Sequence, residues 1–213
     1  MKLYFAPRTC SLSPHIIARE AGLQIDLIRV DIRTEPHRTA SGVDYADVNP
    51  KGYVPALELD DGQLLTEGVA IAQYLADLAP ESGLAPPAGT LQRYRLQEWL
   101  TFVSSELHKM FSPWLFHPEY GEAAEKIARA RIIERYAFLE RHFVTHSYLL
   151  GDTFTVADAY AFAIIGWSQL KQINLKPFPK LDRYVERISA RPKVQEAMRA
   201  EGLLEELRPQ MAN

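Results

Sequence analysis

The sequence has a single cysteine, Cys10, among its 213 residues. One thiol cannot form a disulfide within the chain, and this usage is typical of a reducing compartment. No stretch approaches the roughly 20 consecutive apolar residues that a membrane-spanning helix needs. The apolar residues 3–6 before Pro7 are too few for the core of a signal peptide. We therefore expect a cytoplasmic protein that has no membrane partner.

The sequence also lacks an excess of charge. Its 24 Lys and Arg residues against 27 Asp and Glu residues give a formal net charge of -3, with no basic stripe and no charged tail. This balance does not indicate a nucleic-acid partner. Hydrophobic residues make up 47% of the chain, which is an ordinary globular composition. A chain of this length can bury a core without cross-links, in one large domain or two modest ones.

The first 79 residues alternate between strand and helix patterns. The polar, irregular segment 33–48 is also assigned to helix, although little periodicity supports that assignment. Turn residues and apolar spacing predict the remaining elements. These are strands at 3–5 and 25–30, a helix at 11–21 with Pro14 in its first turn, a hairpin of 56–59 with 63–66, and a helix at 69–78.

The segment 79–89 concentrates proline and glycine, which is typical of a linker. After it, apolar residues recur at helical spacing and no strand pattern is convincing. The expected helices are 91–111, 123–143, the strongly apolar and centrally buried 156–173, and 180–198, which is broken near Pro192. The sequence therefore predicts an α/β domain followed by an all-helical domain.

Cys10 lies between the first predicted strand and the first predicted helix, which Ser11 or Ser13 could cap. At this position we expect backbone N–H groups and the helix dipole to face the thiol and to favour the thiolate. The spacing C-x-x-S is that of a redox dithiol motif whose second thiol is a hydroxyl. The alternative is a small buried hydrophobic residue, which is common for free cysteine.

Two further segments suggest a site for a peptide-like ligand. A cis bond between Val54 and Pro55 would leave the Val54 backbone free to pair with an extended ligand, although an ordinary trans bond is the commoner case. Gly68 lets a ligand approach a helix start whose N–H groups bind carboxylates, and Glu67 could hold an ammonium group. The alternative is plain helix capping, with Thr66 as the cap.

These segments, in this order, resemble cytosolic glutathione transferases. The resemblance rests on Cys10 after the first strand, on N-P-K-G-Y-V-P at 49–55 and on L-T-E-G-V-A-I at 65–71. In the second half, residues 104–109 resemble the bacterial beta class, which uses a cysteine near the thiol. Residues 151–158 resemble the N-capping box of the family's core helix. The resemblance covers nearly the whole chain.

The resemblance implies a thioredoxin-like glutathione-binding domain at 1–79, a linker at 80–89 and an all-helical domain at 90–213 that carries the hydrophobic substrate side. It implies Cys10 and His108 as catalytic residues. Arg33 or Arg38 would replace a lysine that relatives place after Asp31. The implied glutathione-binding residues are Cys10, Val54, Pro55, Glu67, Gly68, Thr101, Ser105, Glu106 and His108.

The implied function is conjugation of the glutathione thiolate to apolar electrophiles, with thiol-disulfide exchange at Cys10. Glutathione would be the co-substrate, no metal would be needed, and the chain would form a homodimer. His108 would stabilise a thiolate or orient the cysteine, although a lone helical histidine is usually a surface residue. The pair His142 and His146 lacks a third metal ligand nearby and is interpreted as surface. The alternatives are a non-catalytic binding protein and a glutathione-dependent isomerase or dehalogenase.

Overall fold

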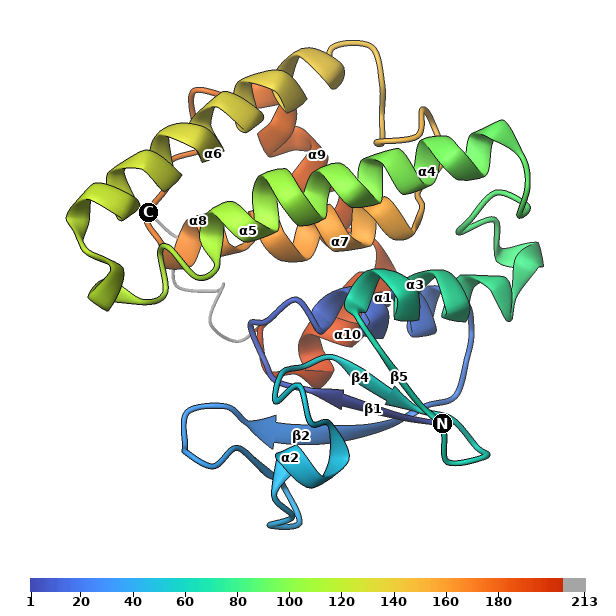
Figure 1. The fold of residues 1–213 in the computed structure, drawn as a ribbon. Coiled ribbons are helices and arrows are strands. Elements are labelled where there is room, and N and C mark those ends of the chain that lie inside the picture. Colours follow the sequence, from blue (N-terminus) through green and yellow to red (C-terminus); the bar gives the residue numbers. More distant parts are fainter. Residues whose placement is uncertain (205–213) are drawn as a thin grey trace. The chain divides into compact units, whose positions relative to one another are not determined.

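The structure is a computed structural model that describes residues 1–204 (Figure 1). It divides into two compact units. One comprises Met1–Leu84 together with the residues from Arg191 on, and the other comprises Ala85–Ala190. Each unit buries an apolar core of its own.

The first unit contains a five-stranded sheet with the order β3-β2-β1-β4-β5. Its strands are β1 (Lys2–Phe5), β2 (Asp26–Asp31), β3 (Arg38–Thr39), β4 (Ala56–Glu58) and β5 (Leu64–Thr66). β1 pairs in parallel with β2, while β4 is antiparallel to both β1 and β5. Since a parallel pair needs a crossover connection, helix α1 (Leu12–Glu20) joins β1 to β2. Cys10 therefore lies where the sheet ends and the crossover helix begins.

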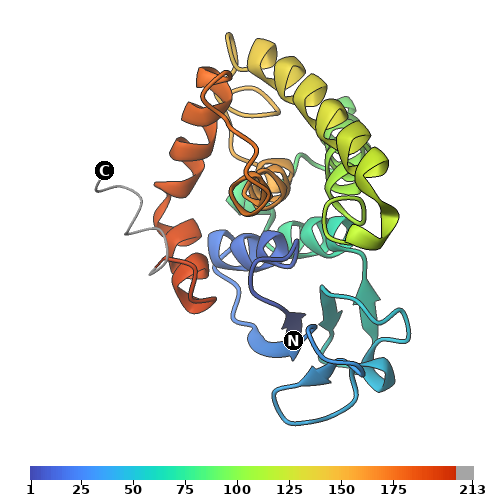
Figure 2. The same cartoon turned by 90° about the vertical axis from the view of Figure 1, so that its left-hand side faces the viewer.

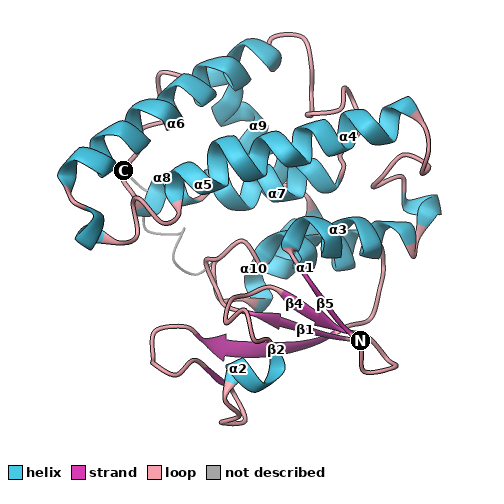
Figure 3. Cartoon of the chain, in the orientation of Figure 1, coloured by secondary structure: helices cyan, strands magenta, loops and turns pink. Residues whose placement is uncertain are grey.

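The other helices of this unit are α2 (Tyr45–Val48), α3 (Gly68–Asp77), the short η1 (Pro80–Ser82) and α10 (Pro192–Ala200). Helix α1 packs against both α3 and α10, and Figure 3 shows α1 and α3 beside each other on one side of the sheet. The packing thus groups α10 with the sheet, whereas the sequence predicted that residues 90–213 form the helical domain. The boundaries at 79 and 90 stay a prediction.

The helix expected over 33–48 is wrong for most of that segment. Only Tyr45–Val48 is helical, and Arg38–Thr39 forms an edge strand instead. Pro36 has no backbone N–H to donate within a helix, and no apolar face repeats at helical spacing. A helix begins only where the Asp44 carboxylate accepts the Ala46 N–H at 3.0 Å as an N-cap.

The second unit consists of helices. These are α4 (Leu91–Phe102), the π-helical η2 (Val103–His108), α5 (Lys109–Phe111), η3 (Pro118–Tyr120), α6 (Glu122–His142), α7 (Val156–Ile165), α8 (Trp167–Leu170) and α9 (Pro179–Ser189). Every residue of α7 is buried, and Figure 2 shows this helix nearly end-on among its neighbours. The expected central helix is confirmed, but it ends at Ile165, and Gly166 separates it from α8. No helix among residues 1–204 is long and apolar enough to cross a membrane.

A buried carboxylate fixes the start of α7. One oxygen of Asp158 accepts the Leu149 N–H at 2.8 Å and the Tyr184 hydroxyl at 3.0 Å. The other accepts the Thr155 N–H at 2.8 Å and the Thr155 hydroxyl at 2.9 Å. The N-capping box expected at 151–158 is therefore confirmed, and it ties the preceding loop and α9 to the central helix.

Candidate functional site

Cys10 is half-buried in the turn between β1 and α1. Its Sγ lies 3.7 Å from the backbone oxygen of Val54, to which the thiol donates. The fold thus brings together two of the predicted site residues that lie 44 positions apart in the sequence.

The turn around Cys10 is held by its own hydrogen bonds. The Ser11 N–H donates to the Thr9 hydroxyl at 3.2 Å. The Leu12 N–H donates to the Thr9 carbonyl at 3.3 Å, and the Ser13 N–H to the Cys10 carbonyl at 3.1 Å. The turn therefore gives each of these three N–H groups an oxygen acceptor, and the expectation that backbone N–H groups face the thiol stays a prediction. Ser11 is the N-cap residue, but its side chain makes no capping bond. The dipole of α1 still favours a negative charge at this end of the helix.

The peptide bond between Val54 and Pro55 is cis, as the resemblance implied. Pro55 precedes β4, and the start of α3 lies close to it. A Cβ added to Gly68 would lie 3.3 Å from Pro55 Cγ, which is tighter than most real contacts. Glycine at position 68 therefore allows the start of α3 to approach the turn that carries Val54.

Glu67 is the N-cap residue of α3, and Thr66 is not. Its φ of 68° lies in the left-handed region, which residues other than glycine rarely adopt. Its side chain does not cap the helix. Instead, Glu67 Oε1 accepts from Lys51 Nζ at 2.6 Å and from the Tyr53 hydroxyl at 2.8 Å. Strained backbone of this kind concentrates at ligand sites.

Lys51 and Tyr53 were not singled out in the sequence, although both lie within the motif N-P-K-G-Y-V-P. Their hydrogen bonds to Glu67 are the largest cause of a raised pKa in each side chain. Lys51 also donates to the Thr66 hydroxyl at 2.9 Å. We call Lys51, Tyr53 and Glu67 the charged cluster. It offers a cation and an anion side by side, which matches the two charged groups of an α-amino acid.

Arg33 and Arg38, the two alternatives for a ligand-binding cation, bond within their own loop. Arg33 pairs with Asp31 at 3.3 Å, and Arg38 donates to the Gly42 carbonyl at 3.0 Å. Neither contact joins these arginines to the charged cluster. The contacts therefore give no reason to prefer either arginine over Lys51.

The predicted site residues of the second unit form two groups according to their contacts, His108 in one and Thr101, Ser105 and Glu106 in the other. His108 ends η2, and its Nδ1 lies 2.6 Å from the hydroxyl of Tyr160 on α7. Its ring also packs edge-on against Trp167, with 5.0 Å between centroids. Burial, with a smaller effect of the neighbouring Lys109 charge, lowers the pKa of His108 to about 4. Near neutral pH, His108 is therefore an uncharged imidazole.

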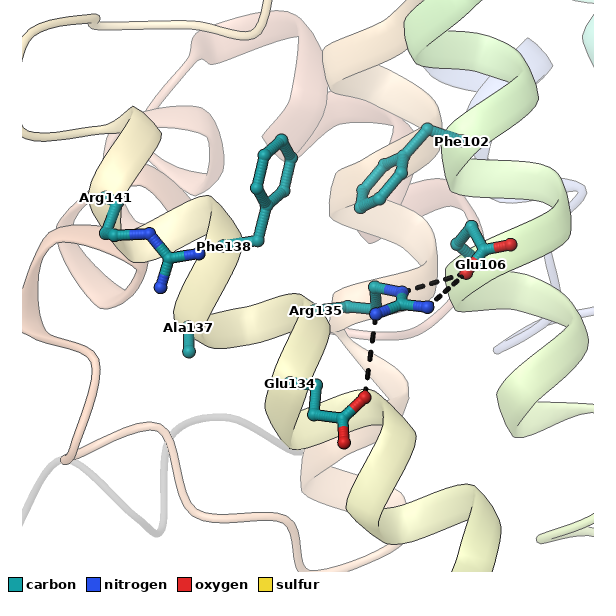
Figure 4. Close-up of a pocket in the computed structure, with 7 residues that line it drawn as sticks. All are labelled: Phe102, Glu106, Glu134, Arg135, Ala137, Phe138 and Arg141. Carbon is teal, nitrogen blue, oxygen red and sulfur yellow. Dashed lines mark hydrogen bonds and ion pairs between the residues drawn. The ribbon is translucent and has the colours of Figure 1, made fainter.

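Thr101, Ser105 and Glu106 make contacts within the same unit. The Thr101 and Ser105 hydroxyls donate to carbonyls one turn earlier in their own helix, at 2.8 and 3.0 Å. Glu106 Oε2 accepts two hydrogen bonds from Arg135 on α6, at 2.8 and 2.6 Å (Figure 4). The Val54 contact of Cys10 lies within the first unit, and the Tyr160 and Trp167 contacts of His108 lie within the second. The roles of the second group toward glutathione stay predictions.

Known protein families match both units. The model described as the glutathione S-transferase N-terminal domain matches residues 8–78, and the one described as the C-terminal domain matches residues 102–192. The chain belongs to the glutathione S-transferase family. It is 42% identical over 203 residues to glutathione S-transferase GstA of Escherichia coli O157:H7, covering 95% of this chain and all of the relative.

Two solved structures give the same result. A sphingomonad glutathione S-transferase complexed with glutathione and a beta-class enzyme from Sphingomonas chungbukensis are each 42% identical to this chain, with a TM-score of 0.90. Each alignment covers 95% of this chain and all of the other. The expected family, its transferase activity and its fold are confirmed.

Proposed function

We propose that this transferase joins the thiol of glutathione to apolar electrophiles and that Cys10 adds a second, disulfide-exchange activity. The observation that carries the proposal is the convergence of three segments. The Cys10 thiol contacts Val54, the cis-Pro55 turn meets Gly68, and Glu67 stands at the start of α3. The similar sphingomonad enzyme solved with glutathione supports the choice of co-substrate.

The charged cluster suits the γ-glutamyl end of glutathione. That end carries an ammonium and a carboxylate on one carbon, and Glu67 and Lys51 offer the complementary charges 2.6 Å apart. Gly68 opens α3, whose first N–H groups favour a carboxylate. The Val54 backbone would pair with the cysteinyl unit, which brings the glutathione sulfur to Cys10.

In conjugation, the glutathione thiolate attacks an electrophilic carbon. A carbon–sulfur bond forms, and the leaving group departs with the electron pair of the bond that breaks. The protein contributes by positioning the two reactants and by stabilising the thiolate. His108 would provide one of the stabilising contacts. The helical unit would hold the apolar substrate.

In the exchange reaction, the Cys10 thiolate attacks a mixed disulfide of glutathione. A disulfide forms between Cys10 and glutathione, and the other thiol leaves as its thiolate. A second glutathione then attacks this bond, which releases oxidised glutathione and restores Cys10. This second thiol is needed because the chain has no other cysteine.

A homodimer in the cytoplasm is also part of the proposal. The helical unit has an open groove of about 610 Å³, lined by Phe102, Glu106, Glu134, Arg135, Ala137, Phe138 and Arg141 (Figure 4). The rings of Phe102 and Phe138 pack together with 5.3 Å between centroids, yet Phe138 stays 41% exposed. An exposed aromatic pair beside charged side chains fits an interface core with a polar rim. A single 24.2 kDa species in sedimentation at micromolar concentration would contradict the dimer.

The decisive test separates an enzyme from a binding protein. We expect the protein to turn over a chromogenic aryl halide in the presence of glutathione and to bind glutathione in calorimetry. Turnover should need both reactants. Binding of glutathione without turnover of any aryl halide, epoxide or enone would favour the non-catalytic reading, and absence of binding would contradict the proposal as a whole.

A further inference from the structure

His108 forms a hydrogen bond with a buried hydroxyl on another helix. Tyr160 belongs to α7, is 5% exposed, and places its hydroxyl 2.6 Å from His108 Nδ1. The two residues are 52 positions apart. The packing of η2 against α7 therefore sets the hydrogen-bond partner of His108 Nδ1.

The length of this bond indicates which group donates. Bonds donated by N–H groups centre near 2.9–3.0 Å, whereas those donated by hydroxyls are shorter. The length of 2.6 Å fits a hydroxyl donor, so we take Tyr160 as the donor and Nδ1 as the acceptor. A neutral imidazole carries one proton, so an acceptor at Nδ1 leaves the proton on Nε2. The pKa of about 4 keeps His108 in this neutral state across the physiological range.

We infer that Tyr160 is a positioning residue that fixes His108 as the Nε2–H tautomer, so that His108 offers the reacting thiolate a neutral N–H donor. This inference rests on the proposed function, in which His108 contacts the thiolate. It gives His108 a defined role among those open to a histidine. A ring whose Nε2 already carries a proton cannot accept one there, so His108 is not the base that ionises glutathione.

The surroundings of His108 restrict the ring in the same way. Its edge meets Trp167, which also packs edge-on against Phe111 and Phe116, with 5.9 and 5.2 Å between centroids. The residue ends a π-helical segment inside a longer helical run, an irregularity that often occurs at functional sites. The packing of Trp167 limits rotation of the His108 ring, while the hydrogen bond from Tyr160 to Nδ1 places the ring proton on Nε2.

Nitrogen NMR of His108 tests the tautomer without relying on activity. The spectrum of the ¹⁵N-labelled protein, assigned with the His108→Gln variant, should show a protonated Nε2 and an unprotonated Nδ1. Tyr160→Phe should convert this into a mixture of both tautomers. Tyr136→Phe is the matched control, because it removes a buried hydroxyl that bonds to Ser168 in the same unit. A wild-type ring protonated at Nδ1, or no change in Tyr160→Phe, would overturn the inference.

Ligand addition and kinetics test the donor role. Glutathione should shift the Nε2–H resonance more than S-methylglutathione, whose sulfur cannot become a thiolate. Tyr160→Phe should lower kcat for conjugation about tenfold, as expected for weakening one hydrogen bond to a charged group, with little change in KM for glutathione. His108→Gln should retain more activity than His108→Ala, because an amide N–H can replace Nε2–H.

The outcomes separate this inference from the proposed function. If wild-type protein conjugates glutathione but its Nε2–H does not respond to glutathione, the donor role of His108 is wrong. If the wild type neither binds nor conjugates glutathione, the proposed function itself fails, whatever the tautomer.

Discussion

Replacing Asp158 with alanine should strongly destabilise the helical unit while leaving its surface intact. The carboxylate is fully buried and accepts four hydrogen bonds, two from backbone N–H groups and two from hydroxyls. The hydroxyls of Thr155 and Tyr184 can turn toward other acceptors after the substitution. The Leu149 and Thr155 N–H groups cannot turn, so they would stay buried without partners.

The two stranded N–H groups set the size of the effect. Each unsatisfied buried donor costs about 1–3 kcal/mol, and a lost N-cap costs about 0.5–2 kcal/mol. These two costs overlap, because the stranded Thr155 N–H belongs to the N-cap residue of α7 and is already part of the capping box. We therefore expect Asp158→Ala to lower the free energy of unfolding by about 3–5 kcal/mol. Since domains are typically stable by only about 5–15 kcal/mol, this loss should be easily measured.

Urea denaturation followed by circular dichroism is the appropriate assay. Burial raises the pKa of Asp158 to about 6, so pH 8 ensures that the four donors face a charged carboxylate. Asp152→Ala is the matched control, because this aspartate lies in the same loop but is exposed, and it should change stability by less than about 0.5 kcal/mol. Asp158→Asn should give an intermediate loss, since one oxygen remains. A loss below about 1 kcal/mol in Asp158→Ala would refute the reasoning.

Three further variants address the site. Cys10→Ala should abolish thiol-disulfide exchange but only reduce conjugation, since the nucleophile in conjugation is the glutathione sulfur; exchange that persists in this variant would show that Cys10 is structural. Glu67→Gln should weaken glutathione binding about ten- to a hundredfold, as expected for losing a charge-assisted contact of about 1.5–3 kcal/mol, and unchanged calorimetric affinity would return Glu67 to a structural role. His108→Gln should change the pH dependence of stability, because the folded pKa of His108, about 4, lies below the usual 6.5. As the pH falls from 7 to 4, the free energy of unfolding of the wild type should fall by about 3 kcal/mol relative to that of the variant. A difference between the two proteins that is the same at both pH values would contradict a pKa of about 4.

Local sequence signals predicted the elements that carry the site. Proline and glycine marked the boundaries of α1 and α3, and apolar spacing identified the fully buried α7. The segment 33–48 was predicted poorly, because β3 has two residues and depends on pairing with β2 for its existence. An element that is stabilised by a distant strand carries no periodic signal of its own.

The sequence predicted site residues that lie within one contiguous motif, but not the contacts between residues that are distant in the sequence. Glu67 and Gly68 were recognised from their own segment, but the ion pair between Glu67 and Lys51 joins residues 16 positions apart. Lys51 had no separate signal, since a lysine after a proline in a loop is usually a solvated side chain. Likewise, the bonds that occupy the N–H groups near Cys10 depend on Thr9, whose role follows from the shape of the turn.

The surroundings of the Cys10 thiol differ from those of a cysteine that a helix start activates. At a helix start, a cysteine is often activated by N–H donors. Here the Leu12 and Ser13 N–H groups bond to carbonyls of the same turn, and the thiol donates to the Val54 carbonyl. Glutathione that pairs with the Val54 backbone would compete for the same region, so its binding would release the thiol. Cys10 should therefore react faster with an alkylating reagent in the complex than in the free protein, and alkylation with and without a non-reactive glutathione analogue would measure that difference directly.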